Sequence, residues 1–234
     1  MLGQTSLKIV TRPSPNHDAR PAGVPVDILV MHYTGMRTAE AALARLCDPA
    51  SKVSSHYTVD EDGTVYAHVV ESARAWHAGT SWWAGARDIN ARSVGIEIVN
   101  PGHEFGYRAF PAEQIDAVIA LSKDILSRHP IPAHRVLGHS DVAPGRKEDP
   151  GELFPWHQLA AAGIGIWPHE HKAVLPISFE KALRRYGYGI RPDTEVSPEQ
   201  AITAFQRHFR PSRLDGVLDA ECEAILAGLL AKLD

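Results

Sequence analysis

The chain has 234 residues, of which 44% are hydrophobic, and its formal net charge is −4 at pH 7. With no long basic run, this balance excludes the electrostatic footprint of a protein that binds nucleic acid or an anionic membrane surface. The hydrophobic content is sufficient for one large domain, or for a medium-sized domain with a small companion.

The N-terminal residues and the cysteines bear on the cellular compartment. Residues 1–23 contain neither the apolar core of a secretory signal nor an apolar run long enough to cross a membrane. Cys47 and Cys222 are far apart and form no CxxC motif, which is typical of reduced thiols packed in a core. We therefore expect a cytoplasmic protein without membrane insertion.

The first strand and the first helix are expected within residues 24–46. Residues 24–35 form a short, nearly continuous apolar run that ends at Thr-Gly, the pattern of a strand buried on both faces. His32 stands at the C-terminal end of this run. A helix is predicted around residues 38–46.

Two further stretches predict strands. Residues 54–70 contain two alternating segments separated by Glu-Asp-Gly, which indicates a β-hairpin. Residues 92–100 form another apolar strand, interrupted only by Glu97.

The following part predicts a helix, a strand and a loop. Residues 111–130 open with proline, repeat apolar residues at the spacing of one helical face, and stop at Arg-His-Pro. Residues 134–138 predict a brief strand, which leads into residues 138–151. That segment contains two prolines and three glycines, so neither a helix nor a strand interior is expected in it. With a closing helix over residues 155–163, the layout is α/β.

The C-terminal part changes to three short helical stretches. In the second of them, Ser197 and Gln200 have the spacing of a capping box. The preceding linker has two prolines and no clear period, which places a boundary near residue 170. We therefore predict a first domain over residues 1–170 and a small three-helix domain over residues 171–234.

The chain has thirteen histidines, and most of them need no functional explanation. An isolated histidine is more often a surface or hydrogen-bonded core residue than a ligand. This interpretation is applied to His17, His103, His129, His134, His169, His171 and His208. His32 differs because a titratable group at the end of a buried strand is costly unless it has a partner or a function.

Three side chains are candidate metal ligands. His139 begins the loop rich in proline and glycine, and Asp149 follows ten residues later. Together with His32 they would form a set of two histidines and one carboxylate, which leaves the fourth tetrahedral position of a zinc ion open to water. By spacing alone, any histidine and aspartate ten residues apart would qualify, and the pattern does not identify a substrate.

Two more residues would complete a hydrolytic site. Glu97 either faces solvent on a one-sided sheet or lies in a cleft, where a carboxylate near zinc-bound water is the usual general base. Lys147 is either a solvated loop lysine or close enough to the metal to stabilise an oxyanion.

Five ordered motifs within residues 28–156 carry a family resemblance. They are "VMHYTG", "SSHYTVDEDGTVYAHV", "AWHAGTSWW", "SVGIEIVN" and "VLGHSDVAPGRKEDPG". Together they resemble the zinc-dependent N-acetylmuramoyl-L-alanine amidases of the amidase-2 family, whose fold is shared with peptidoglycan recognition proteins. The resemblance implies a central mixed sheet flanked by helices. It also implies hydrolysis of the amide that joins N-acetylmuramic acid to L-alanine of the stem peptide.

The resemblance also implies roles for individual residues. The zinc ligands would be His32, His139 and Asp149, Glu97 would be the catalytic carboxylate, and Lys147 would help to hold the oxyanion. Four further residues are expected at the substrate groove, although the last of them has an equal structural interpretation: Trp76, His77, Asn90 and His56.

The C-terminal segment resembles the three-helix peptidoglycan-binding domain. The similarity lies in "ALRRYGYGI", "AITAFQRHF" and "LDGVLDAECEAILAGLL". Cys222 stands where that family usually has threonine. The segment is therefore interpreted either as a glycan-binding domain or as a packing partner of the first domain.

Alternative functions remain open at this point. The same fold binds muropeptides without cutting them when a metal ligand is lost, but all three ligand positions are filled here. A zinc peptidase acting within the stem peptide would have different ligand motifs. The absence of an export signal favours a cytoplasmic recycling enzyme acting on 1,6-anhydro muropeptides. The wall-binding-like segment favours a cell-envelope or phage-type lysin acting on polymeric peptidoglycan. The oligomeric state is not indicated.

Overall fold

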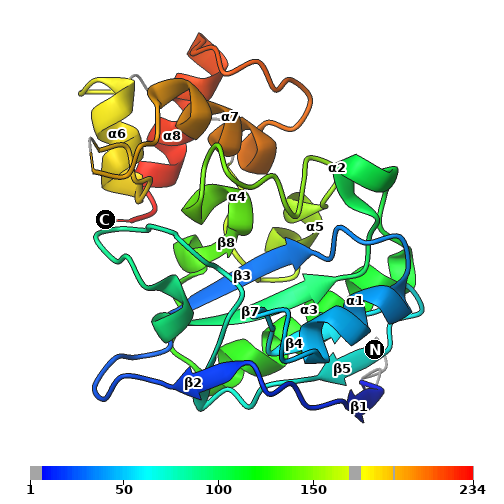
Figure 1. The fold of residues 1–234 in the computed structure, drawn as a ribbon. Helices are drawn as coiled ribbons and strands as arrows, with labels where there is room; N and C mark the ends of the chain where they lie inside the picture. Colours follow the sequence, from blue (N-terminus) through cyan, green and yellow to red (C-terminus); the bar gives the residue numbers. More distant parts are fainter. Residues whose placement is uncertain (1–6, 169–174, 192, 234) are drawn as a thin grey trace.

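A six-stranded mixed β-sheet forms the centre of the molecule (Figure 1). The computed structural model describes residues 7–168, 175–191 and 193–233. In spatial order, the strands of the sheet are β1 (Ile9–Thr11), β5 (Val65–Ala67), β4 (Tyr57–Val59), β7 (Ser93–Ile98), β3 (Ile28–Tyr33) and β8 (Val136–Gly138). Neighbouring strands are parallel except β4 and β5, which form the expected antiparallel hairpin. The predicted α/β fold with a central mixed sheet is confirmed.

The alternation of side chains in β3 and β7 gives the two faces of the sheet different roles. Leu29 of β3 and Ile96 of β7 pack in one buried cluster with helix α3 (Ala112–Arg128). Because successive side chains of a strand point to opposite faces, His32 and Glu97 lie on the face away from α3. The parallel register pairs these two residues directly. Two predicted site residues are therefore neighbours at the ends of adjacent strands.

The two main helices of the first region lie on opposite sides of the sheet (Figure 1). The predicted helix after β7 is confirmed as α3, and its apolar positions, including Ile115 and Leu121, are buried. Helix α1 (Ala39–Cys47) agrees with the helix expected around residues 38–46 and is capped by the Thr38 side chain. Within the described residues, the structure contains no helix with the length and hydrophobicity to cross a bilayer.

Several short elements were not expected from the sequence. They are β1, β2 (His17–Ala19), β6 (Ala73–Ala75), α2 (Gly102–Phe105) and the 3-10 helices η1 (Ile89–Arg92) and η2 (Ala133–Arg135). Strands β2 and β6 pair as a separate antiparallel ribbon. Elements of three or four residues are too short to display a hydrophobic period, so sequence periodicity does not reveal them.

The segment over residues 138–151 differs from the expectation. It contains a one-turn helix, α4 (His139–Val142), where no helix was predicted. The sequence of this turn, HSDV, has neither proline nor glycine, and the Asp141 side chain accepts a hydrogen bond from the Gly138 N–H at 2.7 Å. The prolines and the later glycines begin only at Pro144, so the loop character is confined to the second half of the segment.

Three helices make up the C-terminal part, as the sequence predicts. They are α6 (Phe179–Tyr186), α7 (Pro198–Phe209) and α8 (Ala220–Leu230), and they follow the closing helix α5 (Trp156–Ala161). The predicted capping box is confirmed, because Ser197 and Gln200 exchange side chain to backbone hydrogen bonds at the start of α7.

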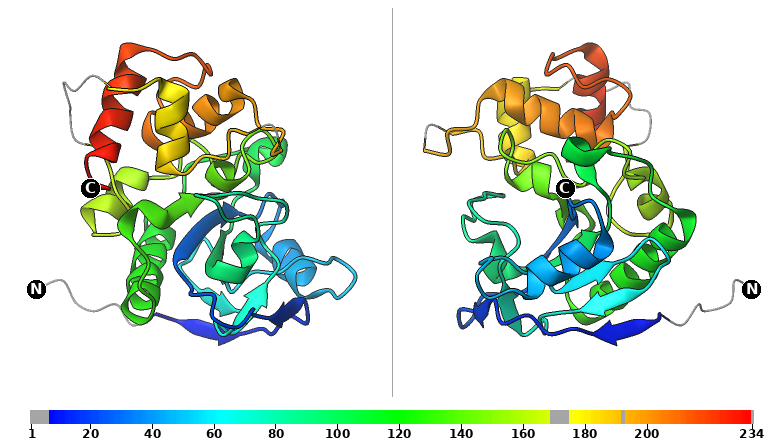
Figure 2. Two further views of the ribbon diagram at one scale, coloured as in Figure 1. Left: turned by 90° about the vertical axis from the view of Figure 1, so that its left-hand side faces the viewer. Right: turned by 45° about the vertical axis from the view of Figure 1, so that its right-hand side comes forward.

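The C-terminal helices share a hydrophobic core with the rest of the chain. Both views in Figure 2 show them, in yellow to red, as one layer packed beside the sheet region. Phe205 and Leu226 belong to the same buried cluster as Val30 of β3, Leu137 of β8 and Val142 of α4. The proposed boundary near residue 170 lies outside the described residues, as do His169 and His171.

A half-buried ion cluster around Glu71 ties the hairpin to the end of α3. Its carboxylate accepts hydrogen bonds from the Tyr57 hydroxyl at 2.7 Å, from Arg128 at 2.7 Å and from the His129 Nε2–H at 2.6 Å. Burial raises the pKa of Glu71, but the hydrogen bonds from Arg128, Tyr57 and His129 outweigh that effect and bring the pKa to about 2. The folded state therefore favours the ionised form of this carboxyl.

This depressed pKa predicts a pH-dependent contribution to stability. We expect Glu71→Gln to lower the free energy of unfolding by about 1–2 kcal/mol near pH 7, a value discounted for solvent screening. Because the folded pKa lies below the unfolded one, the deficit is complete above pH about 4.5 and shrinks as pH falls toward 2. Denaturant unfolding at pH 7 and pH 3 measures it. Glu61→Gln, which removes an exposed partner of Arg108, is the control. An equal deficit for Glu71→Gln at both pH values would contradict the assignment.

Candidate metal centre and active-site cleft

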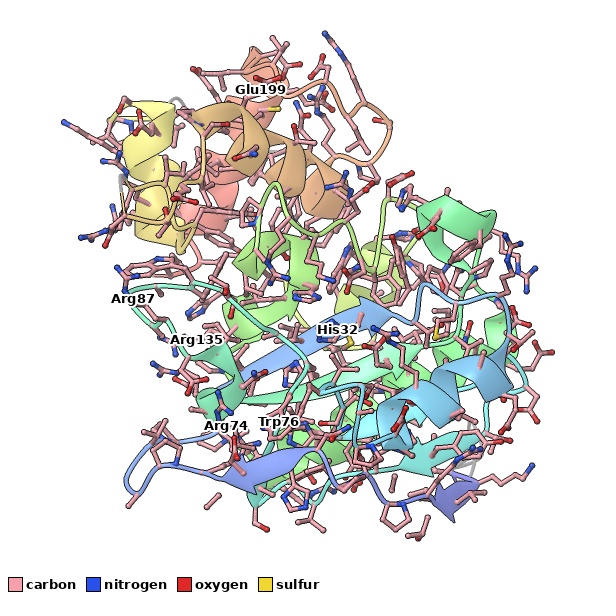
Figure 3. All side chains as sticks on the ribbon, viewed as in Figure 1. His32, Arg74, Trp76, Arg87, Arg135 and Glu199 are labelled. Atoms are coloured by element: carbon pink, nitrogen blue, oxygen red, sulfur yellow. The ribbon has the colours of Figure 1, made fainter. Side chains whose placement is uncertain are left out.

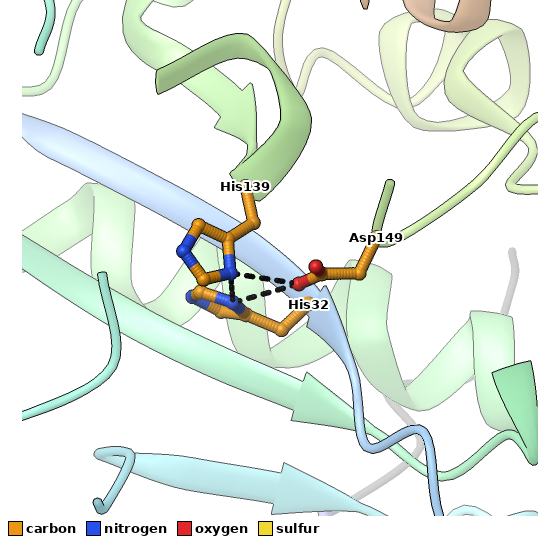
Figure 4. Close-up of side chains that lie close together, drawn as sticks. All are labelled: His32, His139 and Asp149. Atoms are coloured by element: carbon orange, nitrogen blue, oxygen red, sulfur yellow. Dashed lines mark hydrogen bonds and ion pairs between the residues drawn. The ribbon is translucent and has the colours of Figure 1, made fainter. Parts of the chain in front are cut away.

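The three predicted ligands converge at one buried point (Figure 4). His32 ends β3, His139 begins α4, and Asp149 lies at the end of the loop that follows α4. The two Nδ1 atoms are 2.9 Å apart, and each is 3.0 Å from Asp149 Oδ2. In Figure 3, His32 lies near the middle of the molecule on β3. Segments more than a hundred residues apart therefore form one cluster.

The hydrogen bonds on the far side of each imidazole determine where its proton lies. His139 Nε2 is 3.0 Å from the Ala78 carbonyl, which can only accept, and 3.4 Å from the Arg146 guanidinium, which can only donate; the shorter contact favours a proton on Nε2. His32 Nε2 faces His77 Nδ1 at 3.0 Å, and His77 Nε2 faces Ser93 Oγ at 3.1 Å. Since the Ser93 hydroxyl donates to the Ile89 carbonyl at 2.6 Å, it accepts from His77. His77 then accepts from the His32 Nε2–H.

This proton arrangement leaves three lone pairs facing one another. Neither Nδ1 of His32 and His139 carries a proton, and Asp149 Oδ2 is a third acceptor. Burial, and then the repulsion that a protonated His139 ring would exert, lower the pKa of His32 to about 4, which keeps its ring neutral at pH 7. A site of acceptors without a donor fits a cation.

The dimensions of the triangle fit zinc. With bonds of about 2.0–2.1 Å, a tetrahedral zinc ion holds its ligands about 3.3 Å apart, a few tenths of an ångström more than the spacing here. Two neutral imidazoles and a carboxylate are ordinary zinc ligands, and three protein ligands leave one position free. His77 and the Ala78 carbonyl orient the two imidazole rings from behind, as outer partners of a metal site do.

Glu97 lies beside this cluster with an unsatisfied oxygen. Its Oε2 is buried and has no hydrogen-bond partner among the described residues. Burial, and then the charge of Asp149, raise the pKa of Glu97 well above its ordinary value, whereas Lys147 lowers it. A carboxyl with a raised pKa and a free oxygen, next to a metal site, is suited to proton transfer near neutral pH.

The cluster opens into a cleft of about 670 Å³, a volume in the range of small-molecule sites. Glu97, His139, Asp149 and Lys147 all line it, and Arg45 of α1 and His103 of α2 lie on its walls. The expected groove residues Trp76 and His77 also line it. The Trp76 indole N–H donates to Asp18 of the β2 strand at 2.8 Å, and Arg74 donates to the same carboxylate, beside β2 in Figure 3.

Two expected groove residues lie behind the cleft wall instead. His56 is fully buried, its Nδ1 accepts from the Gly95 N–H at 3.0 Å, and its Nε2 lies 3.2 Å from the Ala73 carbonyl. The expectation that His56 borders the cleft is thereby corrected: it is a hydrogen-bonded core residue. Asn90 is also buried, and its Oδ1 accepts from the backbone N–H groups of His77 and Ala78. Its contact with a stem peptide stays a prediction.

Two functional contacts were not expected from the sequence. Ser93 orients His77 and lies on the same face of β7 as Glu97, so the alternation along that strand was the available signal. Arg146 donates to the Ala78 and Thr80 carbonyls at 2.8 and 2.7 Å, which ties the loop after α4 to the segment that contacts His139. Nothing in the local pattern distinguishes this arginine from a solvated one.

A metal-dependent hydrolase requires metal ligands, a free coordination position, a neighbouring carboxyl and an open cleft. At the ends of the parallel strands, this chain brings together three candidate ligands, a carboxyl and a cleft. Comparison with known families agrees with this class. The family described as N-acetylmuramoyl-L-alanine amidase matches residues 22–152. The chain belongs to this family and is an N-acetylmuramoyl-L-alanine amidase.

Similar proteins of known sequence and structure extend the match beyond that region. The chain is 40% identical over 232 residues to the N-acetylmuramoyl-L-alanine amidase AmiD of Escherichia coli, covering 88% of this chain and 83% of the relative. A structure of E. coli AmiD in complex with the substrate anhydro-N-acetylmuramic acid-L-Ala-D-gamma-Glu-L-Lys superposes with a TM-score of 0.79 at 39% identity, covering 90% of this chain and 91% of the other.

A second solved structure covers still more of the chain. AmpDh3 from Pseudomonas aeruginosa, in complex with an anhydromuramic pentapeptide, superposes with a TM-score of 0.80 at 34% identity. The superposition covers 94% of this chain and 98% of the other. Coverage of this extent includes most of the C-terminal helices.

His77 packs closely against Gly95 of β7, so substitutions at these two residues should have non-additive effects on stability. A Cβ added at Gly95 would lie 2.5 Å from the His77 ring, so Gly95→Ala should displace that ring. We expect it to lower the free energy of unfolding by about 1–3 kcal/mol, the usual effect of overpacking. In a His77→Ala background the same substitution has room, and its effect should largely vanish. Denaturant unfolding of the double-mutant cycle measures this, and equal effects in both backgrounds would show that the two residues do not clash.

Proposed function

We propose that this amidase uses a zinc ion held by His32, His139 and Asp149 to hydrolyse the amide between N-acetylmuramic acid and L-alanine of a stem peptide. The observation that carries the proposal is the convergence of two Nδ1 lone pairs and a carboxylate oxygen within 3.0 Å, with no proton among them. Zinc in this position supplies Lewis acidity, which polarises the scissile carbonyl and makes water a better nucleophile at neutral pH.

Glu97 is the general base and later the general acid in this proposal. It shares the sheet face of His32, and its free Oε2 can accept a proton from the attacking water. Its raised pKa makes the protonated carboxyl a competent donor to the departing amine of L-alanine. One carboxyl therefore handles both proton transfers, and the proton taken in the first step is returned in the second.

Lys147 is proposed to stabilise the oxyanion that forms at the carbonyl carbon. It lines the same cleft as Glu97 and Asp149, and its charge lowers the pKa of Glu97, which is the electrostatic signature of its proximity. A cation already in place where negative charge develops stabilises a transition state more than the ground state.

The substrate is proposed to be a soluble 1,6-anhydro muropeptide. The two superposed structures hold anhydromuramic peptides, and they cover nine-tenths or more of this chain. Polymeric peptidoglycan, the substrate of a cell-wall lysin, is the second possibility and serves as a comparison in the test below. The assignment to the cytoplasm stays a prediction, which fractionation of native cells examines.

Mass spectrometry of a digest tests the proposed reaction. With 1,6-anhydro-N-acetylmuramoyl-L-Ala-D-Glu-L-Lys as substrate, we expect the free tripeptide and the anhydro sugar, together heavier than the substrate by one water. Rates on isolated sacculi should be lower. Glu97→Gln should keep its zinc and lose a factor of about 10²–10⁴ in kcat, and Lys147→Met a factor of about 10²–10³.

The other outcomes distinguish the alternative functions. A shortened peptide still attached to the sugar would indicate a peptidase, and an intact but bound substrate would indicate a recognition module. Wild-type kcat in either variant, with zinc content unchanged, would remove that residue from the mechanism.

A further inference from the structure

A buried hydrogen-bonded cluster joins the C-terminal helices to the turn that carries His139. Asp141 Oδ1 accepts from the Tyr188 hydroxyl at 2.7 Å, and Oδ2 accepts from His208 Nδ1–H and from the Gly138 N–H, both at 2.7 Å. Asp141, Tyr188 and His208 are 0%, 1% and 3% exposed. Two of the three donors to this carboxylate therefore come from the C-terminal part of the chain.

The helix that this cluster contacts has little stability of its own. Helix α4 has four residues, His139 is its first and Asp141 its third. A single helical turn fixes several dihedral angles for very few hydrogen bonds, so it has little intrinsic stability and depends on its surroundings. The direction in which His139 projects is consequently set by what holds Asp141 and Gly138.

The same cluster supports the other side of the turn. The His208 ring stacks on the Trp156 ring, with centroids 3.8 Å apart and planes 18° from parallel. Trp156 in turn lies against Gly138, where an added Cβ would be 3.3 Å from the indole and 2.9 Å from Pro150. Gly138 therefore lies between Pro150 and Trp156. Pro150 directly follows Asp149, and the Trp156 ring stacks on His208.

The two ligands of this segment are also linked directly. The Ser140 N–H donates to the Asp149 carbonyl at 2.9 Å, so the backbone after His139 and the backbone at Asp149 move together. A shift of α4 would therefore change the positions of two of the three ligands relative to His32, which is anchored in the sheet.

We propose that Tyr188 and His208 are positioning residues for the metal centre, acting through Asp141 to hold His139 and Asp149 at the spacing that zinc requires. The inference rests on the zinc site proposed above. It gives the C-terminal helices a role in the amidase site that does not depend on whether they bind glycan.

In this proposal, the hydrogen bonds to Asp141, more than the volume of the two side chains, hold the metal ligands in place. Loss of the Tyr188 hydroxyl leaves Asp141 Oδ1 without a donor, and loss of the His208 N–H leaves Oδ2 with the Gly138 N–H alone, so the carboxylate turns toward other donors or water. Metal ligands must be held within about half an ångström of their working positions. Removal of an outer partner of a ligand typically weakens metal binding by about 10–100-fold.

The first test compares two tyrosines of the same buried cluster. Tyr188→Phe removes a donor to Asp141, whereas Tyr186→Phe removes a hydroxyl that makes no hydrogen bond to Asp141. The zinc dissociation constant is measured in the full chain by competition with a chromophoric chelator, well below the unfolding midpoint. We expect about tenfold weaker binding for Tyr188→Phe and less than about twofold for Tyr186→Phe. The visible spectrum of the cobalt-substituted protein should change only in Tyr188→Phe.

A second pair of variants separates the donor of His208 from its ring. An asparagine amide can place an N–H near the position of Nδ1, whereas leucine has no donor, and both lose the stacked ring. His208→Asn should therefore bind zinc more tightly than His208→Leu.

The outcomes distinguish a role in metal binding from a role in folding alone. If Tyr188→Phe melts at a lower temperature but keeps the wild-type zinc affinity and cobalt spectrum, Tyr188 supports only the fold and the proposal is overturned. Equal affinities of His208→Asn and His208→Leu would overturn the part of His208. If the wild-type chain itself binds no zinc, the metal site fails and this inference fails with it, a result that the variants alone would not produce.

Discussion

Two imidazole nitrogens and a carboxylate oxygen, all acceptors, face one another at about 3 Å in a place that water scarcely reaches. Buried acceptors repel each other unless a cation lies among them, so this arrangement fits a site for a metal ion. The sheet places His32 and Glu97 side by side, and α4 with its loop brings His139 and Asp149 to meet them. His77 and the Ala78 carbonyl, behind the two rings, favour the tautomers that leave both Nδ1 lone pairs free.

Much of the strand pattern and part of the site can be predicted from the sequence, because buried strands are recognisable as apolar runs. His32 at the end of an apolar strand and Glu97 inside another are each costly to bury, and that cost marks them as functional candidates. The parallel register that makes them neighbours was not predictable, since pairing between distant strands depends on the whole fold. For His139 and Asp149 the family resemblance is the stronger signal, because a histidine and an aspartate ten residues apart are common.

Features that depend on contacts between distant segments cannot be read from local sequence. His56 looked like a cleft residue because it precedes a hairpin strand, but a backbone N–H of the neighbouring strand satisfies it inside the core. The relay from His32 through His77 to Ser93 joins three separate segments and leaves no local pattern. Helix α4 is not indicated by the glycine and proline content of residues 138–151, because those residues flank it and its own four residues contain none.

The C-terminal helices connect the site to the rest of the chain. They share a hydrophobic cluster with β3 and β8, and Tyr188 and His208 donate hydrogen bonds to Asp141 in the turn that carries His139. X-ray absorption at the zinc edge of the purified full chain tests the central claim most directly. The account predicts one zinc per chain, with two imidazole nitrogens and light oxygen ligands at about 2.0–2.1 Å and no sulfur. A chain without stoichiometric zinc, or with zinc bound to sulfur, would contradict it.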